Sequence, residues 1–119
     1  MNQIGEKMDY AEKTKSCRNL NPQELIALLK FNLFMFWSWG VNPKKFIIDS
    51  QKDCRMFRMN VRGRHHKGLV YIFVNGLDLF DVYLTDYKGK IKDIGTDIYF
   101  DDLANWIDEK IEKIEAYVR

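Results

Sequence analysis

Cysteine is scarce in this 119-residue chain, and its scarcity bears on both compartment and chemistry. Cys17 and Cys54 are the only two cysteines, they form no C-x-x-C pair, and their separation fits no zinc-binding template. We therefore expect two free thiols in a reducing compartment and no metal site. The alternative, which applies to an extracellular protein, is a disulfide bond between Cys17 and Cys54.

A long apolar run is also absent. The most apolar stretch, residues 25–39, contains Lys30 and Asn32 and is shorter than the roughly 20 residues of a membrane-spanning helix. The first 16 residues lack the apolar core and small-residue cleavage site of a signal peptide. These absences predict a cytoplasmic protein without a membrane partner, and we expect a bacterial one.

The chain carries little net charge, because 19 Lys and Arg residues stand against 17 Asp and Glu residues, a balance of +2. Such a molecule has no strong overall field to attract nucleic acid or an anionic membrane, so any such binding needs a local patch. Hydrophobic residues make up 46% and charged residues 30%, which is typical of a folded domain. We expect one domain over residues 21–119, preceded by a flexible or partly helical arm over residues 1–20.

Catalytic signatures are missing as well. The sequence contains no G-x-S-x-G, phosphate-binding loop, H-E-x-x-H or dinucleotide-binding fingerprint. Its carboxylates fall mainly at expected strand ends and turns, where nothing pairs two of them as acid and base: Asp78, Asp81, Asp86, Asp93 and Asp97. The sequence therefore predicts a protein that is not an enzyme and that uses no cofactor.

Two helices are predicted at the ends of the domain. Asn21, Pro22 and Glu24 have the spacing of a helix cap, a first helical residue and a reciprocal capping partner, and Gly40 supplies a stop. The first helix should therefore span residues 21–39. Asp101 can cap a second helix that runs to about residue 118 and carries one apolar stripe: Leu103, Ile107, Ile111, Ile114 and Val118.

Between the helices, turn residues separate five candidate strands over residues 46–49, 54–62, 68–75, 79–86 and 90–94. The short connections between them favour hairpins and hence an antiparallel meander. Period-two alternation places only apolar residues on one face, such as Phe57, Val70 and Val82. We predict an α+β, two-layer sandwich in which a four- or five-stranded antiparallel sheet carries both helices on one face.

The first helix carries more aromatic residues than one buried stripe requires. At 100° per residue, Phe31, Phe34 and Trp37 point away from the stripe, and exposure of such rings forfeits roughly 2–3 kcal/mol each. Either the arm or the C-terminal helix covers them, or they bind a protein partner or a second copy of the chain. Asn32 projects toward the core side of this helix and should need a hydrogen-bond partner there.

The second sheet face mixes rings and charges. If both helices occupy the apolar face, this face is open, and it can stack single-stranded bases, anchor a protein, or remain solvated. The connection that contains Arg64, His65 and His66 is the densest basic segment, which suits either a phosphate contact or a solvated turn. The candidate residues for this face and connection are Arg58, Arg62, Arg64, His65, His66, Lys67, Tyr71, Phe73 and Tyr83.

Our leading interpretation is a non-enzymatic protein-interaction or self-associating module that uses Phe31, Phe34 and Trp37. The alternative is a nucleic-acid-binding module that uses the aromatic and basic sheet face together with the hairpin at residues 62–67.

Overall fold

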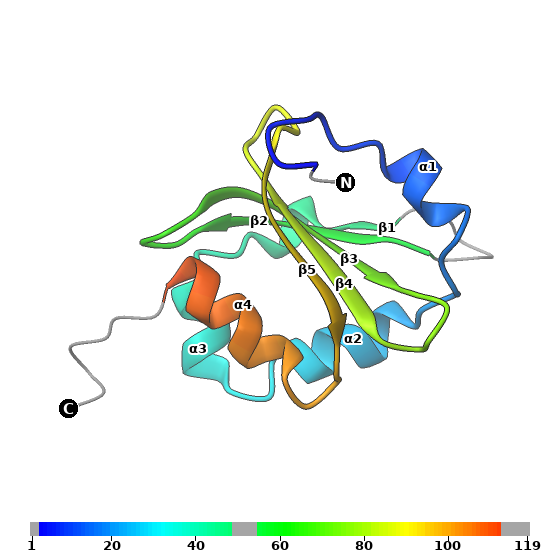
Figure 1. Ribbon diagram of the computed structural model, residues 1–119. Coiled ribbons are helices and arrows are strands. Elements are labelled where there is room, and N and C mark those ends of the chain that lie inside the picture. The colour runs from blue at the N-terminus through cyan, green and yellow to red at the C-terminus, as the bar shows by residue number, and fades with distance from the viewer. Residues whose placement is uncertain (1–2, 49–54, 113–119) are drawn as a thin grey trace.

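The computed structural model describes residues 3–48 and 55–112, and within them it contains one antiparallel sheet with helices on both faces (Figure 1). Its elements in chain order are α1 (Tyr10–Thr14), α2 (Pro22–Leu29), α3 (Leu33–Ser38), the 3-10 helix η1 (Pro43–Lys45), β1 (Ile47–Ile48), β2 (Phe57–Arg62), β3 (Lys67–Val74), β4 (Phe80–Thr85), β5 (Ile91–Ile98) and α4 (Leu103–Ile111). The strand order β1-β2-β3-β4-β5 is a meander, so the predicted α+β class and antiparallel sheet are confirmed. Cys54 and the predicted helical residues 113–118 lie outside the described residues.

The first predicted helix is two helices. Asn21 caps α2 by accepting hydrogen bonds from the backbone N–H groups of Gln23 and Glu24, as its sequence predicts. Asn32, however, has an extended backbone (φ −116°, ψ 104°), and its side chain accepts from the N–H of Met35 to cap α3. The predictions of a continuous helix and of a core-facing Asn32 are wrong, because an Asn side chain satisfies a helix start better than a helix interior.

One sheet face forms the larger core. Helices α2, α3 and α4 lie below the sheet in Figure 1, and their apolar side chains pack against those of the central strands. Phe36 and Trp39 of the α3 region and Ile107 of α4 are fully buried there. The indole Nε1 of Trp39 donates a hydrogen bond to Asp108 Oδ1 at 3.0 Å, which ties the α3 region to α4.

The opposite sheet face is covered by the N-terminal arm, which lies above the sheet in Figure 1 and contains α1. Met8 and Cys17 of the arm pack in a second apolar cluster with the rings of the central strands. Tyr71, Phe73 and Tyr83 are only 4%, 0% and 7% exposed. The prediction that these rings lie on an open face is wrong, and the placement of helices on one face alone is not confirmed. The arm lies over these rings because removing apolar rings from water stabilises the folded chain.

Backbone hydrogen bonds hold the arm at both ends. Near the β4–β5 turn, the Met8 N–H donates to the Gly89 carbonyl at 2.7 Å and the Ile91 N–H donates to the Glu6 carbonyl at 2.8 Å. At the other end, the Arg18 N–H donates to the Val74 carbonyl at 2.7 Å. The arm therefore crosses the sheet as a strap attached at two places.

Candidate functional site

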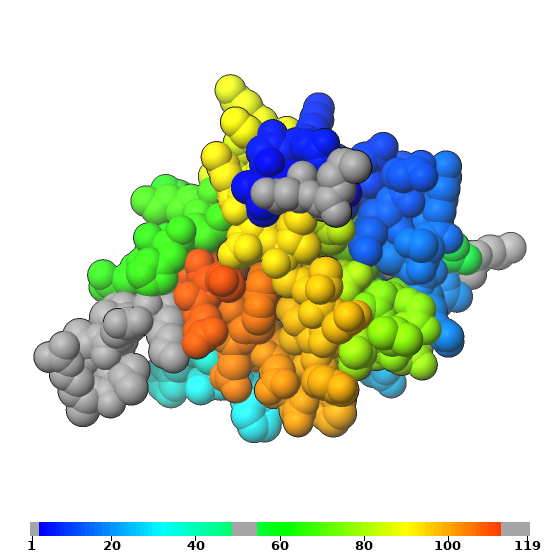
Figure 2. Space-filling view, in the orientation of Figure 1, coloured from blue at the N-terminus to red at the C-terminus, as the bar shows by residue number. Residues whose placement is uncertain are grey.

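An aromatic surface lies on α3 and the turn before it, made of Phe31, Leu33, Phe34 and Trp37. Phe31 is 86% and Phe34 is 92% exposed, and Leu33 and Trp37 are also exposed. Of the two alternatives left open by the sequence, internal cover therefore does not hold for Phe31 and Phe34 among the described residues. Figure 2 places α3 and this turn, in cyan, at the lower rim of the molecule, away from the blue arm.

The break at Asn32 explains how α3 divides its aromatic residues. Because α3 restarts with its own cap, Phe36 and Trp39 face the core while Phe34 points into solvent. Lys30 is the charged residue nearest to these rings in sequence, and its ammonium lies 5.8 Å from the Trp37 ring centre. The same ammonium lies 5.6 Å from the centre of the Phe36 ring, so it covers buried and exposed rings together.

The structure separates the basic candidate residues from the aromatic candidate residues of the second sheet face. Arg62, Arg64, His65 and Lys67 are exposed, while Arg58 and His66 are half-buried. Arg62 and Lys67 are direct partners in the β2–β3 register, so the structure brings them together. It does not bring them together with exposed rings, because the arm covers Tyr71, Phe73 and Tyr83.

The histidine pair does not form a metal site in the described part of the chain, where no group of three His, Cys, Asp or Glu residues could hold an ion. The His65 N–H donates to the Ile111 carbonyl at 2.7 Å, which joins the hairpin to α4. Burial lowers the pKa of His66 despite its ring Nε2 lying 3.4 Å from the Leu69 carbonyl oxygen. Burial therefore favours the neutral form of the His66 imidazole.

A basic cavity of about 400 Å³ opens beside Arg62 and Lys67. Its lining comprises Gly40, Asn42, Lys45, Asn60, Arg62, Lys67 and Tyr87. Lys45, Asn42 and Tyr87 are more than fifteen residues from the predicted hairpin, and sequence reasoning missed them because no local pattern links them to it. The next recess, which also contains Arg62 and Lys67, includes Arg64 and Glu112. There the Arg64 Nε lies 3.5 Å from Glu112 Oε1.

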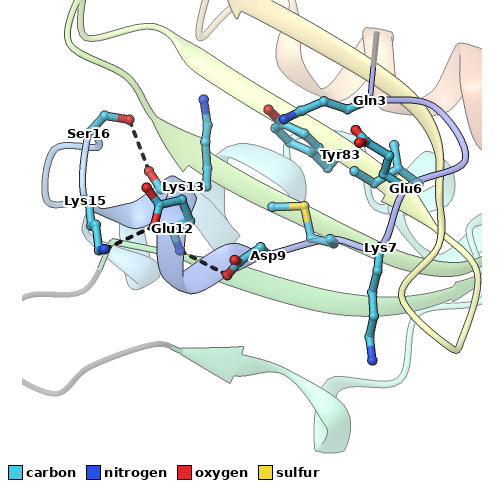
Figure 3. A pocket seen from close by; sticks show the side chains of 11 residues that line it. Gln3, Glu6, Lys7, Asp9, Glu12, Lys13, Lys15, Ser16 and Tyr83 are labelled. Carbon is cyan, nitrogen blue, oxygen red and sulfur yellow. Dashed lines mark hydrogen bonds and ion pairs between the residues drawn. The ribbon is translucent and has the colours of Figure 1, made fainter. Parts of the chain in front are cut away.

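A larger cavity of about 620 Å³ lies between the arm and the sheet (Figure 3). Several of its polar groups are engaged with one another within the arm. Lys15 pairs with Glu12 at 3.0 Å, and the Glu12 N–H donates to Asp9 Oδ1 at 3.1 Å. Met8, Tyr83 and Ile91 also line it. These contacts cap α1 and hold it against the sheet. Among them no acid and base face a common point, as general acid–base catalysis would require.

Lys13 connects this arm helix to the buried Asp81. Its ammonium lies 2.8 Å from Asp81 Oδ2 and 5.6 Å from the centre of the Tyr83 ring. Asp81 Oδ1 also accepts from Asn75 Nδ2 at 2.9 Å and from the Asp97 N–H at 3.1 Å. Burial acts to lower the pKa of Lys13, but the hydrogen bond and charge of Asp81 outweigh it and raise that pKa. Asp81 is therefore a buried anchor for the arm.

Cys17 lies under the same helix as a free, buried thiol, which confirms the prediction for this residue. Its Sγ donates to the Lys13 carbonyl at 3.1 Å. Burial raises the pKa of Cys17, which disfavours the thiolate and hence nucleophilic chemistry.

No helix in the described residues is long and apolar enough to cross a bilayer. The chain was also compared with protein-family models, with curated proteins and with solved structures, and none of the three comparisons gives a match.

Proposed function

We propose that this protein is a non-enzymatic interaction module that self-associates through the aromatic surface. The observation that carries this proposal is the near-complete exposure of Phe31 and Phe34, at 86% and 92%. Burying each ring against a partner stabilises the complex by roughly 2–3 kcal/mol, a gain that the isolated chain does not obtain.

The area of the aromatic surface suits a second copy of the chain. Aromatic side chains bury 150–250 Å² each, and Phe31, Phe34 and Trp37 are 86%, 92% and 49% exposed, so these three rings offer roughly 350–550 Å² of apolar contact. A standard interface buries roughly 800 Å² on each partner and consists of an apolar centre surrounded by a polar rim. The aromatic surface is large enough to form such a centre.

The charge and shape of the aromatic surface also favour self-association. A twofold contact places identical residues opposite one another, so a charged patch would repel its own copy. Here the four side chains are uncharged, and the nearby Lys30 ammonium is held over the rings of Phe36 and Trp37. Neither the basic cavity nor the cavity under the arm is lined by Phe31 or Phe34, and the exposed rings suit the surface of a second copy better than an inserted peptide.

Solution mass tests this proposal. Light scattering and sedimentation equilibrium should give a dimer for the wild type and a monomer for Phe34→Asp, because a carboxylate in the contact would have to be desolvated. The matched control is Leu77→Asp, since Leu77 is also 70% exposed but lies on the β3–β4 turn. It should remain a dimer. A wild-type monomer at concentrations up to about 1 mM would refute self-association.

The remaining parts of the proposal concern chemistry and place. We propose that the module uses no cofactor and acts in a bacterial cytoplasm, which suits a buried, free Cys17. The nucleic-acid alternative loses its stacking surface, because Tyr71, Phe73 and Tyr83 lie under the arm. We therefore do not carry that alternative forward.

A further inference from the structure

Three positively charged side chains meet at the basic cavity, and no Asp or Glu lines it. Arg62 ends β2 and Lys67 begins β3, and the two are direct register partners. Like charges placed opposite each other across a sheet repel. Lys45 adds a third charge from η1, and none of the three forms an ion pair within the described residues. Among the described residues, the fold thus places three solvent-exposed cations without an ion-pair partner around one space.

Asn60 adds an unsatisfied acceptor to the same lining. Its carboxamide oxygen is buried and has no hydrogen-bond partner, whereas buried polar groups normally have one. The other such atom in the described part of the chain is Arg58 Nε, two residues earlier on β2. Other polar groups of the cavity are engaged, since Asn42 Oδ1 accepts from the Lys44 N–H and the Tyr87 hydroxyl donates to the Val61 carbonyl.

Backbone geometry builds the wall of the cavity. Gly40 has a φ of +67°, and a Cβ there would lie 2.9 Å from the Arg62 carbonyl oxygen. Glycine therefore allows the turn after α3 to approach the end of β2, where the Arg62 N–H donates to the Trp39 carbonyl at 2.7 Å. Because these contacts are between backbones, Arg62 is held at a defined position beside the turn that leads to Lys45.

We propose that the basic cavity binds a small phosphate monoester. The phosphate would lie among Lys45, Arg62 and Lys67, because charge-assisted hydrogen bonds to phosphate relieve their mutual repulsion. The volume of about 400 Å³ lies within the range of small-molecule sites. This site goes beyond self-association, since it shares no residue with the aromatic surface.

The test uses ribose 5-phosphate as the probe and follows the backbone amides by NMR. Saturable shifts are expected at Gly40, Arg62 and Lys67, with affinity that falls as salt is added. Arg62→Ala and Lys67→Ala should each weaken binding about tenfold or more. Arg64→Ala is the matched control, because it removes the same charge from a side chain that is already paired with Glu112, and its effect should stay within about twofold.

Asn60 supplies the second arm of the test, with inorganic phosphate as the comparison probe. Asn60→Ala should leave the binding of both probes within about twofold of the wild type, because the phosphate contacts the three cations of the cavity and not the buried carboxamide oxygen. Asn60→Asp, which has nearly the same shape, should abolish binding of both by repulsion. Thermal unfolding of each variant checks that the fold is retained.

Three outcomes would overturn the proposal. The first is the absence of saturable shifts around the cavity, and the second is equal loss of affinity in Arg62→Ala and Arg64→Ala. The third is binding of a single-stranded oligonucleotide with no binding of either phosphate probe, which would assign the cations to a different ligand class. Phe34→Asp should bind the probe as the wild type does, so failure of self-association and failure of this site can be distinguished.

Discussion

The contact between Lys13 and Asp81 allows the contribution of the arm's attachment to the free energy of unfolding to be measured. Lys13→Met keeps the aliphatic part of the side chain over the ring of Tyr83 but removes the ammonium that lies 2.8 Å from Asp81 Oδ2. The carboxylate of Asp81 then remains under the arm with its charge less well compensated. We expect the free energy of unfolding to fall, because a buried charge loses its partner.

The structure sets the size of this effect. The side chains of Lys13 and Asp81 are 22% and 6% exposed, so the pair is mostly but not fully removed from water. Breaking a fully buried pair costs about 3–5 kcal/mol, whereas losing one charged hydrogen bond costs about 1.5–3 kcal/mol. Asp81 keeps the hydrogen bonds from Asn75 and Asp97, which places the expected loss near about 2 kcal/mol.

Urea denaturation followed by tryptophan fluorescence measures this loss, which corresponds to a midpoint shift of about 1 M. Lys15→Met is the control, because the pair between Lys15 and Glu12 is exposed and should contribute nothing measurable. The double variant Lys13→Met with Asp81→Asn should recover part of the loss, because the unpaired charge disappears. A loss for Lys13→Met no larger than for Lys15→Met would refute the anchoring argument.

The same contact predicts a dependence on pH. The pKa of Lys13 is raised above its ordinary value of 10.5, so its contribution to stability is complete below pH 10.5 and disappears as pH rises through the higher folded pKa. The stability of the wild type should therefore fall more steeply than that of Lys13→Met in this alkaline range.

Two further predictions concern packing and protonation. Gly95→Ala would place a Cβ against the ring of Trp106 and should cost about 2 kcal/mol, lowering Tm by roughly 8 °C, whereas Gly76→Ala meets nothing within 4 Å and should leave Tm nearly unchanged. An unaltered Tm for Gly95→Ala would contradict the close approach of α4 to β5. The NMR titration midpoint of His66 should lie below 6.5, and the stability linked to it should be complete above pH 6.5 and fall as pH drops through the folded pKa. A midpoint at or above 6.5 would show that the ring is not desolvated.

The cap at Asn21 and strand alternation were predictable because they depend on residues a few positions apart. The predicted Asp101 cap is wrong, since the N-cap of α4 is Asp102, which makes no side-chain capping hydrogen bond. Asn21 caps α2 as its neighbours indicate, and the short connections produce the meander. The alternation of Phe57, Met59 and Val61 correctly identifies the strand face that meets the helices. For the candidate site, sequence identified Phe31 and Phe34 as surplus to one core stripe, and these rings are exposed.

The failed predictions each involve a choice between two locally acceptable arrangements. Asn32 can sit in a helix or begin one, and the restart of α3 is decided by which rings, such as Phe36 and Trp39, reach the core. The alternating pattern of Tyr71 and Phe73 is equally compatible with an open face and with a covered one. Only the path of a distant segment, the arm, decides between them.

The Asn21 cap and the succession of strands could be read from the sequence, because backbone preferences and the two-residue period of a strand act over short distances. The tertiary structure alone decided that the arm covers the rings and that Lys45 joins Arg62 and Lys67 around one cavity. Those outcomes depend on burial and charge between residues far apart in the chain, which no local pattern records.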